Sequence, residues 1–174
     1  ILGAGTNVLA PDEGLREVVI CTKDALTGLR DLGDGKIEAF AGETLSKTAV
    51  FARNLSLTGL EFAHGIPGTV GGGIYMNAGA YGGEMKQVAA QTTVLTMDGE
   101  TRVFTGQAQG FSYRTSAFED LPVIIVKTVF QLAPGDKEEI SARMQELMEK
   151  RRVSQPLELP SAGSTFKRPA GHFA

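Results

Sequence analysis

The alternation of apolar and polar positions divides the chain into a long strand-rich part and a helical end. Short runs rich in β-branched and apolar residues at 17–20, 37–41 and 123–132 predict strands, because turn residues bound them and they are too short for helices. Residues 1–2 have the character of a strand end that leads into a loop containing glycine. The strand-rich part is therefore built from short strands joined by tight turns.

Two turns and a short helix complete this part. Asp98 and Gly99 separate two β-rich runs within residues 88–104, which predicts a hairpin with a type I′ turn. Asp34 and Gly35 give a second turn signal, and residues 44–54 suit a short helix. Strands and helices that do not alternate regularly indicate the α+β class.

The clearest helix signal lies near the end of the sequence. Asp136 can cap a helix, with Glu139 three residues later, and we expect this helix to end near residue 152. Its apolar positions recur at helical spacing and would share one face: Ile140, Met144, Leu147 and Met148. Gly135, just before it, suggests a boundary between a first domain (1–134) and the start of a second (135–174).

Composition narrows the classes of function. The 174 residues are 42% hydrophobic, enough for a sizeable core, and the net charge of -3 gives no basic excess for a nucleic-acid backbone. Cys21 is the single cysteine, and His64 and His172 stand apart, so we expect no disulfide and no metal site. The sequence contains neither an apolar run long enough for a bilayer nor a recognisable signal peptide, which favours a cytoplasmic protein without a membrane partner.

The two ends suggest a fragment. The chain starts at Ile1 without an initiator Met, just before a candidate binding loop, and stops at Ala174 without a turn or cap. We therefore expect residues to be missing at both ends.

The most unusual stretch is residues 65–83, where eight of nineteen residues are glycine. Without side chains, backbone N–H groups can approach a diphosphate and form an anion-binding nest that needs no basic residue. A flexible linker is the alternative, but Pro67, Val70, Ile74 and Met76 make the stretch too apolar for one. This pattern favours a loop that binds the phosphates of a dinucleotide.

Two common nucleotide motifs are excluded. No lysine follows Gly71, Gly72 and Gly73, as a P-loop requires. Gly3 and Gly5 match the first two glycines of a Rossmann fingerprint, but Val8 occupies the position of the third. The two glycine-containing stretches together could instead hold one diphosphate from both sides.

These stretches resemble, in order, the signatures of MurB-type UDP-N-acetylenolpyruvoylglucosamine reductases. The matching motifs lie at residues 3–7, 57–62, 65–83, 113–116 and 161–167. The resemblance covers nearly the whole chain, and residues 65–83 are its most specific part. It implies an FAD-binding domain of the vanillyl-alcohol-oxidase type, with FAD held non-covalently between α+β subdomains, followed by the start of an α+β substrate-binding domain.

The same resemblance implies the residues that contact FAD. Those of the first stretch are Gly3, Ala4, Gly5, Thr6, Asn7 and Val8. Those of the second are Ile66, Pro67, Gly68, Thr69, Val70, Gly71, Gly72 and Gly73, with Asn77, Ala78 and Gly79 nearby. Val126 is expected near the nucleotide, whereas His64 is expected to be structural and not a flavin tether.

The reaction that the resemblance implies is reduction of a UDP-sugar enolpyruvyl ether, with NADPH as reductant and UDP-N-acetylmuramate as product. Negative charge then builds beside a carboxylate, so the site needs a cation and a proton donor. By motif position Arg114 is the cation and Ser164 the proton donor, with Tyr113 and Lys167 as further substrate contacts. The alternatives to these catalytic roles are an exposed ion pair for Arg114 and a structural turn for Ser164.

Two departures from the family bear on activity. Its later catalytic glutamate has no counterpart here, since neither Glu61 nor Glu158 lies in the corresponding motif. Only 50 positions separate Arg114 from Ser164, which fits the shorter, second type of the family. A flavin-binding fragment without turnover, a flavin oxidase or dehydrogenase acting on a sugar or lactone, and a non-catalytic domain stay open; a monomer is expected in each case.

Overall fold

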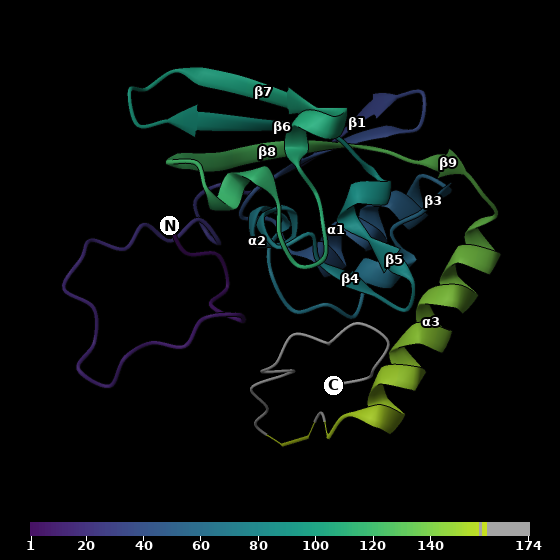
Figure 1. The fold of residues 1–174 in the computed structure, drawn as a ribbon. Helices are drawn as coiled ribbons and strands as arrows, with labels where there is room; N and C mark the ends of the chain where they lie inside the picture. The colour runs from purple at the N-terminus through teal and green to yellow at the C-terminus, as the bar shows by residue number, and fades with distance from the viewer. Residues whose placement is uncertain (157, 160–174) are drawn as a thin grey trace.

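The computed structural model describes residues 1–156 and 158–159, and these form an α+β fold. Its centre is a five-stranded antiparallel sheet in the order β1-β2-β8-β6-β7. The strands are β1 (Leu29–Gly33), β2 (Lys36–Phe40), β6 (Ala89–Thr96), β7 (Thr101–Thr105) and β8 (Val123–Gln131). Figure 1 shows the sheet lying over a layer that contains α1 (Leu45–Asn54) and α2 (Val70–Tyr75).

The remaining elements are short, apart from α3 (Lys137–Ser154). Two small ladders pair β3 (Leu57–Thr58) with β9 (Ala133–Pro134), and β4 (Gly79–Ala80) with β5 (Gly83–Glu84). The 3₁₀ turns are η1 (Glu61–Ala63), η2 (Met85–Gln87), η3 (Gly106–Gln109) and η4 (Ala117–Glu119).

The core lies between the sheet and the helices. Ile37 and Ala39 of β2 and Phe130 of β8 are fully buried, since alternate residues of a strand point to the same face. Ile74 of α2 and Leu45 of α1 bury their side chains in the same cluster. Because α2 is pressed directly against the sheet, the glycine-rich residues 65–83 are part of the packed structure.

The predicted helices at 44–54 and 136–152 are confirmed. Thr44 caps α1 by accepting the N–H of Lys47. Asp136 caps α3 by accepting the N–H of Glu139 at 2.9 Å, and Ile140, Met144 and Leu147 are buried. Helix α3 packs against α1 and η1, and runs along one side of the fold (Figure 1).

The hairpin at Asp98 and Gly99 is present, but its turn differs from the prediction. Gly99 has a positive φ of 82° while Asp98 is not among the described residues with positive φ, so a type I′ turn is ruled out. The N–H of Gly99 donates to Thr96, which leaves a four-residue loop between β6 and β7. The type I′ geometry occurs instead at Asp34 and Gly35, whose φ angles are 51° and 72°.

The predicted strand at residues 17–20 is wrong. The chain there has no ladder, and Leu2 and Cys21 form only an isolated parallel bridge. Val18 is 92% exposed, because among the described residues no strand lies beside it to complete a pairing. Figure 1 shows residues 1–20 as an open loop to one side of the sheet.

Candidate functional site

The two glycine-containing stretches meet in the structure, although about sixty residues separate them in the sequence. We call residues 3–8 the first glycine segment and residues 65–83 the second glycine segment. The hydroxyl of Thr6 donates to the carbonyl of Pro67 at 3.0 Å. A Cβ on Gly3 would lie only 2.4 Å from Oγ1 of Thr69, so this approach requires glycine.

The start of α2 does not offer its N–H groups to a ligand. Val70 donates to the carbonyl of Glu43 and Gly71 to that of Ala41, both at 2.8 Å. The N–H of Gly72 donates to Oγ1 of Thr69, the helix cap. The sequence predicted a loop here, but residues 71–73 are helical and the protein satisfies their first-turn donors.

Packing explains two of these three glycines. A Cβ on Gly71 would lie 3.0 Å from Cβ of Ala41, and one on Gly73 would lie 3.1 Å from a methyl group of Leu45. Both distances are shorter than an ordinary contact, so glycine lets α2 sit close to β2 and α1. Gly72 is exposed and has room for a side chain.

Unused donors lie in the first glycine segment and at the entry to α2. Within the described residues, the backbone N–H groups of residues 3–8, Gly68 and Thr69 donate no hydrogen bond. Gly5 has a φ of 69° and Gly68 a φ of 148°, which turn the chain sharply at both places. Unused backbone donors from two neighbouring segments of the chain can bind a diphosphate.

The other residues expected near FAD lie around α2. Val126 is the extra residue of a bulge in β8, and its carbonyl accepts the N–H of Ala41 at 2.8 Å. The carbonyl of Ala41 accepts from Gly71, so Val126 is linked to the start of α2 through one residue. Ile66 packs on the core, and the N–H of Ala78 donates to Gly73.

Asn77 is buried, with 1% of its surface exposed and a φ of 41°. Its amide donates to Oε2 of Glu84 and to the carbonyl of Ser112, and its Oδ1 accepts the N–H of Lys86. Sequence reasoning did not identify Glu84. The available sequence signal was Gly82 in the dipeptide Tyr81-Gly82, which is typical of a turn. In the structure both residues have a positive φ, and the turn pairs β4 with β5 and brings Glu84 back to Asn77.

Arg114 occupies the tip of a tight turn in which Ser112 and Thr115 exchange backbone hydrogen bonds. Its φ of 57° is in the left-handed region, which costs a non-glycine residue about 1–2 kcal/mol. The guanidinium donates to the carbonyl of Gly79 at 2.9 Å and lies over the ring of Tyr113. Because a guanidinium has five N–H donors, this bond leaves others for a ligand.

The remaining residues singled out from the sequence are only partly covered by the structure. Ser164 and Lys167 lie outside the described residues. Both carboxylate oxygens of Glu61 accept hydrogen bonds, from Thr58 and Gly59, and Glu158 is exposed. Nδ1 of His64 lies 3.2 Å from Oγ of Ser46, as a structural histidine would.

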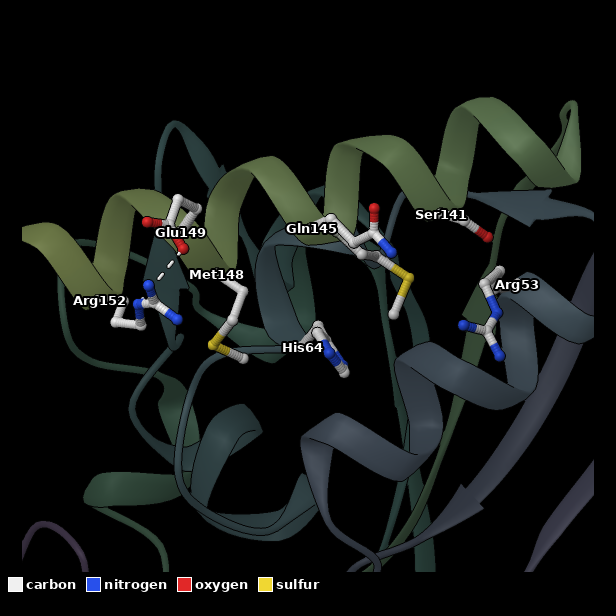
Figure 2. Close-up of a pocket in the computed structure, with 8 residues that line it drawn as sticks. Arg53, His64, Ser141, Gln145, Met148, Glu149 and Arg152 are labelled. Carbon is white, nitrogen blue, oxygen red and sulfur yellow. Dashed lines mark ion pairs between the residues drawn. The ribbon is translucent and has the colours of Figure 1, made fainter. Parts of the chain in front are cut away.

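A hollow of about 410 Å³ lies between α1 and α3 (Figure 2). Arg53, His64 and Met148 are among the eight residues that line it, and none of the eight is a predicted ligand residue. The glycine segments meet elsewhere, so this hollow is not the candidate flavin site. Among the described residues, no group of His, Cys, Asp and Glu could hold a metal ion, and no helix is long and apolar enough to cross a membrane.

Comparison with protein families decides what kind of domain this is. The model of the FAD binding domain matches residues 1–105, more than half of the chain. The chain belongs to the FAD-binding domain family. The prediction of an α+β FAD-binding fold is therefore confirmed, although no motif of the Rossmann type is present.

Individual relatives of this FAD-binding domain carry one name. The chain is 44% identical to the UDP-N-acetylenolpyruvoylglucosamine reductase of Limosilactobacillus reuteri and 46% identical to that of Streptococcus uberis. Each match covers 100% of this chain but 58% and 57% of those relatives. A crystal structure of UDP-N-acetylenolpyruvylglucosamine reductase (MurB) from Thermus caldophilus matches with a TM-score of 0.81 and 35% identity, over 99% of this chain and 62% of that one. The resemblance seen in the motifs is confirmed.

Proposed function

We propose that the full-length protein reduces the enolpyruvyl group of UDP-N-acetylglucosamine enolpyruvate to give UDP-N-acetylmuramate, a peptidoglycan precursor, with bound FAD and with NADPH as reductant. The observation that carries this proposal is the contact between Arg114 and Gly79. The guanidinium of Arg114 thereby lies beside Gly79 in the second glycine segment. Pro67, earlier in the same segment, contacts the first glycine segment through Thr6. The curated reductases that match the whole of this chain, over 58% and 57% of their own length, have the corresponding name.

The described residues fit FAD at the junction of the two glycine segments. The unused N–H groups of residues 3–8, Gly68 and Thr69 would hold its diphosphate. We expect Val126, Ala78 and Gly79 to contact the rest of the cofactor. Asn77 would do so through its backbone alone, because its side chain is buried and fully engaged within the protein. Neither glycine segment contains His or Cys, which supports non-covalent binding. FAD supplies hydride transfer when it is bound.

Arg114 would bind the carboxylate of the substrate. Its remaining N–H donors can make two parallel bonds to a carboxylate, and its charge stabilises the negative charge that develops beside that group. Tyr113 would contact the substrate next to it. Ser164 would donate a proton to the carbon that carries the charge, with Lys167 beside it to stabilise the resulting alkoxide.

The same proposal includes the setting of the enzyme. We expect a monomeric cytoplasmic protein whose partners are small molecules, with neither a nucleic acid nor a membrane bound. The net charge of -3 supports the expectation that no nucleic acid is bound. Residues 1–134 would form the FAD-binding domain and residues 135–174 the start of the substrate-binding domain. Helix α3 packs on the first of these through Ile140 and Met144.

An absorption spectrum of the purified full-length protein with FAD tests the proposal. Under anaerobic conditions, NADPH should bleach the flavin band and UDP-N-acetylglucosamine enolpyruvate should restore it. Recovery with oxygen but not with the enolpyruvyl substrate would instead identify an oxidase, and absence of bound flavin would contradict the cofactor assignment.

Arg114→Lys sharpens the same test. An ammonium keeps the charge but not the planar two-point contact, so flavin reduction by NADPH should persist. Recovery with the substrate should slow by about 10²–10³-fold, the usual effect of losing one stabilising donor. Full recovery rates in this variant would rule out the proposed carboxylate clamp.

A further inference from the structure

The Asn77 side chain joins the glycine-rich segment to the turn that carries Arg114. Its amide donates 2.9 Å to the carbonyl of Ser112, the first residue of that turn, 35 positions away in the sequence. The second amide hydrogen goes to Oε2 of Glu84 at 2.8 Å, and Oδ1 accepts from Lys86 at 2.9 Å. Each hydrogen-bonding group of the amide is therefore used within the protein.

Two further contacts hold Glu84, the acceptor for the Asn77 amide, in place. Oε1 of Glu84 pairs with the ammonium of Lys86 at 2.7 Å, and the backbone N–H of Glu84 donates to the side chain of Gln87. Glu84 is thereby fixed as an acceptor, and the amide of Asn77 has one orientation that satisfies both of its neighbours. At 1% exposure Asn77 also has no room to rotate towards solvent.

The Arg114 turn has two attachments to this segment. Asn77 holds the carbonyl of Ser112, and the carbonyl of Gly79 holds the guanidinium. The left-handed φ of Arg114 is a conformation that persists only where the surroundings impose it. Without Asn77, the carbonyl of Ser112 would lose the bond from this buried amide, while the backbone pairing of the turn, the guanidinium contact with Gly79 and the Ser116 hydroxyl bond to Tyr75 would remain.

We propose that Asn77 is a positioning residue for Arg114: it fixes the arginine-bearing turn and so controls substrate reduction without touching the substrate. The inference rests on the proposed function, because it assigns the effect to the step in which Arg114 binds the enolpyruvyl carboxylate. Loss of Asn77 should therefore affect one half-reaction and spare the other.

The experiment measures the two half-reactions of the full-length holoenzyme by stopped flow. Asn77→Gly removes the amide but tolerates the φ of 41°. Reduction of FAD by NADPH should stay unchanged, and reoxidation by the enolpyruvyl substrate should slow by about 10- to 100-fold, since small misplacement of a binding group has effects of this size. Asp34→Gly is the matched control, because Asp34 also has a left-handed φ but lies on the exposed β1–β2 turn; both of its half-reactions should be unchanged.

A double-mutant cycle separates positioning from general loss of structure. In an Arg114→Ala background, adding Asn77→Gly should slow reoxidation no further, because the two residues act as one unit. Independent, additive losses would overturn the proposal, as would equal slowing of both half-reactions in Asn77→Gly alone.

Two further measurements keep the outcome decisive. Asn77→Asp preserves size, backbone and the bond from Lys86, but it carries at most one donor hydrogen and so cannot donate to both Glu84 and Ser112. It should give the same split if Asn77→Gly does not fold, and failure of both variants to fold would overturn the proposal. Hydrogen exchange is independent of turnover. The N–H of Thr115 should exchange faster in Asn77→Gly while α1 stays protected, and unchanged exchange at Thr115 would contradict positioning even if the wild-type protein proved to be no reductase.

Discussion

The first and second glycine segments look alike in sequence, but their glycines serve different purposes. In the first, residues 3–8 are largely exposed and their N–H groups donate no hydrogen bond within the described residues. In the second, a Cβ on Gly83 would overlap the ring of Phe62, and a Cβ on Gly71 or Gly73 would crowd Ala41 or Leu45. One segment uses glycine to present backbone donors, and the other mainly to bring secondary-structure elements together.

The difference shows that glycine content alone does not define an anion-binding loop. The missing Cβ lets Gly3 approach Thr69, just as it lets Gly71 and Gly73 approach Ala41 and Leu45. Only the first segment, however, leaves the N–H groups of its residues 3–8 unused within the described residues. The segments meet at Thr6, Pro67 and Thr69, where the second also contributes unused donors. Substitutions that add one methyl group can therefore separate effects on stability from effects on FAD binding.

Gly83→Ala should have the largest effect on stability. The new Cβ would lie 2.5 Å from the ring of Phe62, which is 94% buried, so either the ring or β5 must shift. We expect a loss of about 1–3 kcal/mol in the free energy of unfolding, as for other overpacked sites. Urea denaturation measures this loss.

Gly72→Ala is the control for that variant, since its Cβ would be 3.6 Å from the nearest atom and exposed. Alanine suits a helix better than glycine, so stability should stay level or rise by about 0.4–1 kcal/mol. A large loss here would show that the second segment needs its glycines for a reason other than packing.

Gly3→Ala should mainly weaken FAD binding. Its Cβ would lie 2.4 Å from Oγ1 of Thr69, so the first segment must move away from the second. We expect the Kd for FAD to rise about tenfold, equivalent to about 1.4 kcal/mol, with a smaller change in unfolding. Flavin fluorescence titration measures this, with Gly65→Ala as the control, because its Cβ would make only an ordinary contact of 3.4 Å with Arg151. An unchanged Kd in Gly3→Ala would argue against a shared diphosphate site.

Thr69→Ala should affect both properties by about 1 kcal/mol or less. It removes the cap that accepts the N–H of Gly72. Thr44→Ala removes the equivalent cap of α1, where Oγ1 accepts the N–H of Lys47. The two variants should lose similar stability in thermal melts, but only Thr69→Ala should also weaken FAD binding; the same FAD affinity in both would place the diphosphate elsewhere.

Glu146→Gln should have the smallest effect, because it lies on the exposed side of α3 and in neither segment. Side-chain hydrogen bonds from Lys150, and then from Arg143, hold the pKa of Glu146 below its ordinary value. A lowered pKa means that the stabilisation is present at neutral pH and is lost as the pH falls through the pKa of the folded state. Any difference in melting temperature from wild type should be slight at neutral pH and vanish in acid; a difference in FAD affinity is not expected.

Much of the fold could be read from local patterns. Asp136 and Glu139 defined the start of α3, and the apolar run at 123–132 defined β8, because capping and periodicity act within a few residues. The prediction of a strand at 17–20 was wrong, because a strand needs a neighbouring strand to pair with and the local sequence does not show whether one is present. The turn at Asp98 and Gly99 was assigned from composition, while loop length and twist decided its type.

The sequence by itself determined the family and the positions of the two glycine segments, and it marked Arg114 as a candidate, since each is visible in the order and type of neighbouring residues. Only the tertiary structure decided which glycine N–H groups remain unused, because Glu43 and Ala41, which satisfy the start of α2, come from a different part of the chain. It also decided that the amide of Asn77 donates to Glu84 and to the carbonyl of Ser112, which lies 35 positions away in the Arg114 turn. Hydrogen bonds over such separations depend on how the sheet and helices pack, which no local pattern records.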